Sequence, residues 1–292
     1  MRPSVSRRAL GALLMTAAAL IPRPARGQED RPRELAHDTR IDAAITATGA
    51  VWLVVSEVLK PTLVPEKCRW CYRAADGSDT LNPVDKAIRD ALVWKSTRSA
   101  DYTSSVIVFG TEPISALGLL AGAAAYDGAA SGAALDVLLV GEAVVVAQSI
   151  NQVAKFALAR ERPFVHFLPV APDGVRELTA SPSDDNLSFF SGHSTLAFSI
   201  ATSSATVATL RGYRLAPVLW ASGVAQAAAV AYLRIGADKH YFSDVMLGAI
   251  VGSAIGVGLP MLFHGPEDGE ESTGAAAAPS AAPATFGLSG VF

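Results

Sequence analysis

Three long runs of the chain contain no charged residue, and this feature limits the possible folds more than any other. The runs span residues 194–210, 215–232 and 245–263. Each is close to the length of a helix that crosses a lipid bilayer, which needs roughly 20 apolar residues. Three such runs would be unusual in one soluble domain, so they favour a bundle of helices embedded in a membrane.

Three further apolar segments precede these runs, at residues 41–59, 104–125 and 134–158. The second and third carry three carboxylates, Glu112, Asp136 and Glu142. A carboxylate inside a membrane is costly, so we expect these side chains to face the interior of the bundle. Because no strand pattern competes before the tail, the predicted fold is all-α, a membrane-embedded bundle of about six long apolar helices.

The two ends of the chain differ in composition from this core. Residues 1–27 resemble a secretory signal peptide, with arginines before a short apolar run and small residues before a cut at Gln28; an uncleaved anchor is the alternative. Residues 266–292 are acidic and then rich in Ala, Pro and Ser, which predicts a disordered tail. The helical core of the protein is expected within residues 104–265.

Residues 28–103 are expected to hold a charged lead-in, the first apolar helix and a periplasmic loop, with an amphipathic helix at 84–98. This loop contains the only two cysteines, Cys68 and Cys71. In an exported protein a structural disulfide is the favoured interpretation, since a redox pair would need a thioredoxin-like context and two cysteines alone make a weak zinc site. The formal net charge of −3 gives no basic field for nucleic acid.

The stretch from Leu233 to Asp244 concentrates ionisable side chains between two apolar runs. His240 and Asp244 are four residues apart, so at a helix start they share a face, and the carboxylate can accept the imidazole Nδ1–H. Nε2 is then free to act as a nucleophile. Arg234 precedes the histidine across a glycine turn, where its guanidinium could hold an oxyanion beside the ring.

Two other stretches complete an anion site. Lys155 and Arg162 are two helical turns apart, which predicts that both cations project from one helix face before Pro163 ends the helix. The sequence Ser191-Gly192-His193 opens another apolar helix, where free backbone N–H groups and the helix dipole favour an anion. Three cations, a helix N-terminus and two histidines thus converge on a group of the size of phosphate.

In this order and spacing, the three parts resemble the signature of the type 2 phosphatidic acid phosphatase superfamily. The family includes membrane lipid phosphatases, soluble bacterial acid phosphatases and vanadium-dependent haloperoxidases. The chain departs from the commonest pattern at Phe190, where Pro often precedes Ser-Gly-His, and at Leu233, where Ser often precedes the arginine. Neither change removes a reacting group, so both concern the substrate class more than the chemistry.

The resemblance implies a covalent mechanism without a metal or other cofactor. His240 would attack phosphorus and form a phosphohistidine, Asp244 would orient the ring, and His193 would act as general acid and then general base. The non-bridging oxygens would be held by Lys155, Arg162, Ser191, Gly192 and Arg234.

The expected function is hydrolysis of a lipid phosphate or pyrophosphate in a membrane. A soluble periplasmic acid phosphatase and, less favoured, a vanadium haloperoxidase are the alternatives, and a non-catalytic membrane scaffold is a fourth. Lys and Arg are more abundant in the loops on the side of the site, which would place it in the cytoplasm. If segment 41–59 lies outside the membrane, five spans place the site in the periplasm of the inner membrane, and this is the orientation expected here.

Overall fold

The computed structural model describes residues 31–65, 67–74, 76–168, 179 and 182–267. The predicted signal peptide and nearly all of the predicted tail lie outside these residues. Within them the regular secondary structure is helical, and pairing of extended backbone is limited to isolated bridges. The prediction of an all-α bundle is confirmed.

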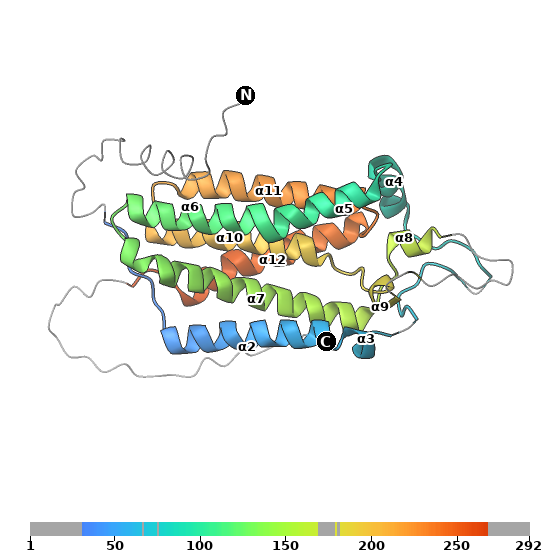
Figure 1. Cartoon of the computed structure of the whole chain (residues 1–292), viewed down its shortest axis with the longest axis horizontal. Coiled ribbons are helices and arrows are strands. Elements are labelled where there is room, and N and C mark those ends of the chain that lie inside the picture. Colours follow the sequence, from blue (N-terminus) through green and yellow to red (C-terminus); the bar gives the residue numbers. More distant parts are fainter. Residues whose placement is uncertain (1–30, 66, 75, 169–178, 180–181, 268–292) are drawn as a thin grey trace, which may run out of the picture.

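Six long helical stretches lie side by side along the length of the molecule (Figure 1). They correspond to the six apolar segments, with ends that differ by a few residues. The second stretch starts earlier than predicted because α5 runs into α6 through a turn of π-helix, η2. The elements are α2 (Thr39–Val58), α5 (Thr97–Val106), η2 (Ile107–Thr111), α6 (Glu112–Tyr126), α7 (Ala133–Leu158), α10 (Gly192–Arg211), α11 (Ala216–Gly236) and α12 (Phe242–Phe263).

Five described helical stretches are long and apolar enough to cross a membrane: Thr39–Val58, Thr97–Tyr126, Ala130–Leu158, Ala216–Gly236 and Phe242–Phe263. Helix α10 is not among them, although its uncharged length predicted a span. It packs against α6, α7, α11 and α12, and most of its residues are buried. Its serines are satisfied inside the helix, as where Ser203 Oγ donates to the Ser199 carbonyl at 2.6 Å.

Helix α2 belongs to the bundle. It lies along α7, where Gly49 packs so closely on Val145 that a Cβ would come within 2.8 Å of that side chain. Most of its other apolar side chains are exposed, among them Ile41, Val51 and Val54. This packing argues against the expectation that segment 41–59 stays outside the membrane.

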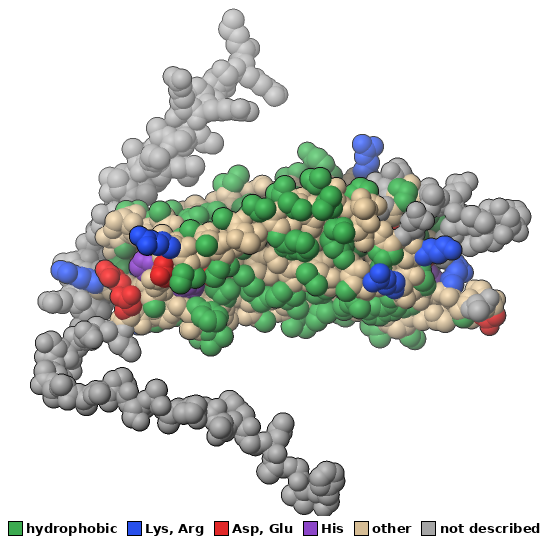
Figure 2. All heavy atoms as spheres, turned by 90° about the horizontal axis from the view of Figure 1, so that it is seen from below, with side chains coloured by type: hydrophobic (Ala, Val, Ile, Leu, Met, Phe, Trp, Pro, Cys, Tyr) green, Lys and Arg blue, Asp and Glu red, His purple; other side chains and the backbone are tan. Residues whose placement is uncertain are grey.

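Seen from the side of α2, hydrophobic side chains cover the middle of the molecule and charged ones gather toward its two ends (Figure 2). This distribution is the one that a bilayer demands of a protein surface. The three carboxylates in the apolar segments are buried, as expected: Glu112 and Asp136 are fully buried and Glu142 is 4% exposed. The Asp136 carboxylate accepts bonds from Arg211 Nε and Tyr213 OH, both at 2.7 Å.

The long helices end in two different sets of connections. At one end lie the short helices α3 (Lys60–Leu63), α4 (Pro83–Leu92), α8 (Pro163–His166) and α9 (Pro182–Asp185) (Figure 1). The amphipathic helix predicted at 84–98 ends early, at Leu92, because the next residues bind α11: Trp94 N–H donates to the Gly236 carbonyl at 3.0 Å. At the other end, the η3 turn (Ala130–Gly132) precedes α7, and the chain before α2 pairs with the chain after α12 through Ala36 N–H and the Gly265 carbonyl.

Candidate active site

A cavity of about 620 Å³ opens at the end of the bundle that carries the short helices. Six of the eight predicted site residues line it: Lys155, Arg162, Gly192, His193, Arg234 and His240. Ser191 and Asp244 lie behind its wall, and both are fully buried. The structure therefore brings together residues from the three separate stretches of the sequence.

His240 lies in the connection between α11 and α12. Its Nδ1 is 2.8 Å from the Ser188 carbonyl oxygen, which can only accept a hydrogen bond, so Nδ1 carries the proton. Nε2 keeps its lone pair and lies 3.5 Å from Arg162 Nη1. Burial, followed by the charges of Arg162 and Arg234, lowers the pKa of His240 well below its ordinary value. The ring is thus neutral at neutral pH, as a nucleophile must be.

Asp244 supports this arrangement from behind. Its Oδ2 lies 3.8 Å from His240 Nδ1, too far for a hydrogen bond, so the carboxylate is not the acceptor that the i,i+4 spacing predicted. It instead accepts from Ser188 Oγ at 2.6 Å and from Tyr241 N–H at 2.9 Å. Asp244 thus fixes the Ser188 side chain and the start of α12, and through these residues it positions the ring.

Lys155 and Arg162 reach the cavity by a route that helical spacing did not predict. Helix α7 ends at Leu158, and Ala159 turns the chain with a left-handed φ of 42°. Arg162 is therefore the extended N-cap of α8 and does not share a helix face with Lys155. Its Nε donates to the Asp184 carbonyl at 2.7 Å and its Nη1 to the Lys239 carbonyl at 3.2 Å, so the guanidinium is fixed in the wall.

The start of α10 provides the helix N-terminus. Ser191 caps the helix, accepting from Ser194 N–H at 3.3 Å, so its hydroxyl serves the cap. A Cβ on Gly192 would lie 2.9 Å from Lys155 Nζ, which places the ammonium directly against the first turn. Only glycine allows the cation and the free N–H groups of this turn to come so close.

His193 and Arg234 form the opposite wall. His193 Nε2 lies 3.3 Å from Ser105 Oγ, and its ring packs edge-on against Phe109. Arg234 Nη1 donates to Asp101 Oδ1 at 2.5 Å and to Ser104 Oγ at 3.0 Å. Burial, followed by the charge of Arg234, lowers the pKa of His193 far below its ordinary value.

Three carboxylates that line the cavity were not predicted: Glu57, Asp101 and Asp184. Asp184 Oδ1 is 3.1 Å from Arg162 Nη2, and Asp101 pairs with Arg234. Although burial opposes ionisation, Arg162, Lys60 and Lys155 hold the pKa of Asp184 below its ordinary value. Asp184 lies only seven residues before Ser191, whereas Glu57 and Asp101 lie far in sequence from the motifs, and none of the three occupies a motif position. Because Asp101 and Asp184 are paired with arginine and Glu57 is paired with Lys60, the donor set of the cavity suits an anion better than a metal ion.

A buried arginine behind the site was also missed. Arg160 is 1% exposed and forms ion pairs with Asp244 and with Asp85, the latter at 2.9 Å. Its guanidinium lies over the rings of Tyr241 and Trp70, at 4.4 and 4.5 Å from their centroids. Because it stands between the two motif cations in sequence, it could have been mistaken for a ligand, but it faces away from the cavity and neutralises Asp244.

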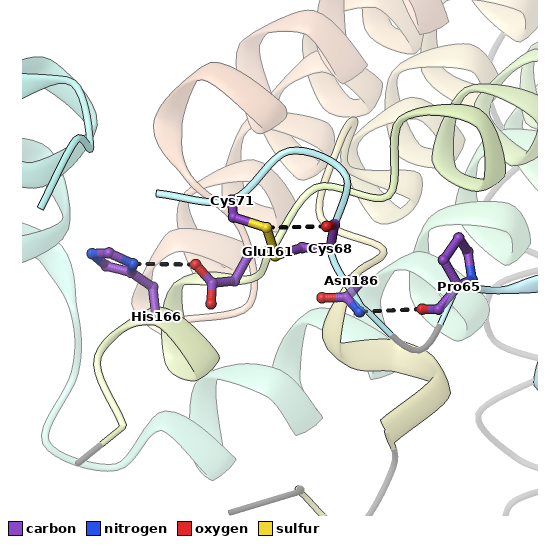
Figure 3. The surroundings of a disulfide bond; sticks show 6 residues. All are labelled: Pro65, Cys68, Cys71, Glu161, His166 and Asn186. Atoms are coloured by element: carbon purple, nitrogen blue, oxygen red, sulfur yellow. Dashed lines mark hydrogen bonds and ion pairs between the residues drawn. A yellow bond between two sulfur atoms is a disulfide. The ribbon is translucent and has the colours of Figure 1, made fainter. Parts of the chain in front are cut away.

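Cys68 and Cys71 form a disulfide at the same end of the molecule (Figure 3). The loop is fastened to the site region: Arg69 N–H donates to the Ala159 carbonyl at 3.1 Å, and Asn186 Nδ2 donates to the Pro65 carbonyl at 3.2 Å. His166 is buried in the same region, with Nδ1 3.2 Å from Glu161 Oε2. The disulfide loop thus packs on the turn that carries Arg162.

Four apolar side chains from the long helices also line the cavity. They are Leu53 of α2, Phe109 of η2, Val144 of α7 and Leu196 of α10. Three of these elements belong to stretches that are long and apolar enough to cross a membrane. A ligand with a charged head and an apolar body would therefore find matching surfaces in one cavity.

Comparison with known proteins gives one family model and one solved structure that are similar to this chain. The family model of the PAP2 superfamily, the type 2 phosphatidic acid phosphatases, matches residues 136–265, which include all eight predicted site residues. A crystal structure of a transmembrane PAP2-type phosphatidylglycerolphosphate phosphatase from Bacillus subtilis is similar over 73% of this chain and 94% of that chain, with 18% sequence identity and a TM-score of 0.44. No curated protein matches the chain. The resemblance carried by the three motif parts is confirmed by the match of residues 136–265 to the family model of the PAP2 superfamily.

Proposed function

We propose that the protein is a membrane phosphatase that hydrolyses a lipid phosphate or pyrophosphate through a phosphohistidine, without a metal ion in the reaction. The observation that carries this proposal is the state of His240: its Nδ1–H is bound by the Ser188 carbonyl, and its unprotonated Nε2 faces a cavity lined by cations. Membership in the PAP2 superfamily supports phosphatase chemistry at this site.

In the proposed reaction, His240 Nε2 attacks phosphorus and the bond to the leaving oxygen breaks. His193, which faces the same cavity, gives its proton to that oxygen. It then takes a proton from the water that attacks the phosphohistidine, which releases inorganic phosphate and restores both histidines. Lys155, Arg162 and Arg234 hold the non-bridging oxygens, where charge is spread in the transition state.

Binding of phosphate requires some rearrangement of the side chains in the cavity. Arg162 and Arg234 are bonded to Asp184 and Asp101, which occupy donors that a phosphate would use. A dianion with more acceptor oxygens competes for the same guanidinium groups. The apolar side chains of the cavity support a lipid as the natural substrate, since they would take the chain beside the headgroup.

Phosphate release tests the proposal. Full-length protein extracted in detergent is given a panel of lipid phosphates, a lipid pyrophosphate and one soluble aryl phosphate, with chelator present. His240→Ala should lower release by at least about 10³-fold, because no other group can form the covalent intermediate. His37→Ala is the control, since that imidazole is exposed at the other end of the bundle and should leave the rate unchanged.

The outcomes separate the candidates. Release that needs His240, survives the chelator and favours lipid supports the proposal. Release confined to the aryl phosphate would favour a non-specific acid phosphatase. If no ester were cleaved, a halogenation assay with added vanadate would test the haloperoxidase alternative. A protein inactive in both assays would support the hypothesis of a non-catalytic membrane scaffold.

A further inference from the structure

A second cluster of ionisable side chains lies at the end of the bundle opposite the phosphate cavity. Asp42 stands in the first turn of α2, Glu142 in α7, and His264 directly after α12. One ligand atom from each lies within 4.8 Å of those of the other two. All three residues are buried, at 3–4% exposure. The proposed phosphatase reaction uses none of them.

The imidazole is oriented as a ligand would be. His264 Nδ1 is 3.0 Å from the Ala36 carbonyl oxygen, so Nδ1 carries the proton and the Nε2 lone pair points into the cluster. Nε2 lies 3.1 Å from Glu142 Oε2. An imidazole that donates through one nitrogen to a backbone carbonyl and offers the other to its neighbours is the arrangement found at metal sites.

The third member of the cluster gives an independent indication. Asp42 Oδ2 is buried and has no hydrogen-bond partner among the described residues. A buried carboxylate oxygen without a donor is strongly unfavourable. A cation bound to Asp42 Oδ2 would supply the partner that this oxygen lacks.

From these contacts we propose that Asp42, Glu142 and His264 bind a divalent transition-metal ion such as Zn²⁺ in a structural site. Two carboxylates and one imidazole form a donor set that suits zinc, whereas Mg²⁺ and Ca²⁺ prefer oxygen alone. The three ligands come from elements that are far apart in sequence. The ion would therefore tie the start of α2 to α7 and to the end of α12.

The surrounding contacts explain why such a tie would matter. Helix α2 is held in the bundle mainly by α7. Beyond the cluster, the chain before α2 and the chain after α12 are joined by backbone bonds, Ala36 N–H to the Gly265 carbonyl and Glu267 N–H to the Glu34 carbonyl. A metal ion bound at the base of this pairing would stabilise the folded chain, because the unfolded chain does not gather the three ligands.

Metal binding to the full-length protein in detergent tests the proposal. The protein is stripped with chelator, reloaded with Zn²⁺, and its metal content and thermal midpoint are measured. We expect one tightly bound ion per chain and a rise of about 5 °C in the midpoint on reloading. Asp42→Asn and Glu142→Gln, which keep the side-chain shape, should lose both effects. His37→Gln is the matched control, because it removes an exposed histidine from the same end of the molecule.

A spectroscopic measurement on the unaltered chain guards against variants that fail to fold. Co²⁺ added to stripped protein should give saturable visible absorption bands, which Zn²⁺ abolishes at one equivalent. Absence of such bands together with no Zn²⁺ retention would overturn the proposal and leave His264 and Glu142 as a simple pair. Equal Zn²⁺ binding by Glu142→Gln would also overturn it. Phosphate release measured at low temperature should be the same in stripped and loaded protein, so the outcome is independent of the proposed reaction.

Discussion

At the scale of single residues, the site is defined by which atoms carry protons. The Ser188 carbonyl fixes the proton of His240 on Nδ1. Asp244 acts indirectly, because its carboxylate accepts hydrogen bonds from Ser188 Oγ and Tyr241 N–H. The spacing of His240 and Asp244 predicted their proximity and the free Nε2. It could not predict the acceptor, because Ser188 reaches the ring from a distant part of the chain whose backbone path carries no sequence signature.

The pKa of His193 leads to a prediction about anion binding. Burial and the surrounding cations keep this imidazole neutral in the empty pocket at neutral pH. A bound dianion is an opposite charge that raises the pKa again, so binding should take up a proton and tighten as the pH falls, by at most about tenfold per pH unit for one proton. Tungstate is a suitable probe because it does not itself titrate near neutrality.

Calorimetry in two buffers with different ionisation enthalpies measures this uptake. We expect uptake of up to one proton at pH 7.5 in the wild type and less in His193→Asn. Binding without any change of protonation would contradict the general-acid assignment, since His193 would then lack the proton that the leaving group needs. The empty protein should also lose stability as the pH falls below about 6.5, where the unfolded histidine binds a proton that the buried one does not.

At the scale of helices, close packing of α12 on α10 positions the anion site. Gly248 faces the start of α10, where a Cβ would come within 2.7 Å of the Ser191 carbonyl oxygen. Gly258 lies on the same helix, and a Cβ there would meet nothing within 4 Å. Close packing on α10 therefore requires glycine at position 248, whereas the surroundings of Gly258 leave room for a larger side chain.

Alanine at each position provides a matched pair. Gly248→Ala should lower the free energy of unfolding by about 1–3 kcal/mol through overpacking, and it should lower phosphate release because Ser191 leads into His193. Gly258→Ala should leave activity unchanged and stabilise the helix by up to about 1 kcal/mol. Thermal unfolding in detergent and kcat/KM for each variant check this pair. Equal effects of the two changes would show that the α10–α12 contact does not control the site.

The long helices were predictable, because apolar runs of this length form few structures other than helices. The backbone path of the irregular segments between the helices was harder to predict. Pro163 marked the end of α7, but the left-handed turn at Ala159 gave no signal, so Arg162 was expected on the wrong element. The Arg160–Asp85 pair joins residues separated by a long stretch of chain, and nothing in either local sequence identifies its partner.

At the scale of the whole molecule, the arrangement of six helices restricts the orientation. Thr39 and Phe263 lie at the end opposite the cavity, and the disulfide lies at the cavity end. If all six long stretches cross, a cleaved signal that exports Gln28 would leave the cavity in the cytoplasm. A disulfide persists in an oxidising compartment, so it favours a periplasmic cavity and residues 31–38 inside the cell. If all six stretches cross, a cleaved signal that exports Gln28 and a disulfide in the periplasm are therefore incompatible.

Surface labelling decides between them. Both native cysteines are first replaced, as Cys68→Ser and Cys71→Ser. Ser78→Cys then places a thiol between the former disulfide and α4, and Ser131→Cys places one between α6 and α7 at the opposite end. Both positions are exposed. We expect a membrane-impermeant maleimide to label the first in intact spheroplasts and the second only after lysis, because the disulfide requires the cavity end to face the periplasm. The reverse pattern would place the phosphate cavity in the cytoplasm, in accord with the excess of Lys and Arg in its loops. It would also mean that substrate reaches His240 from the inner leaflet.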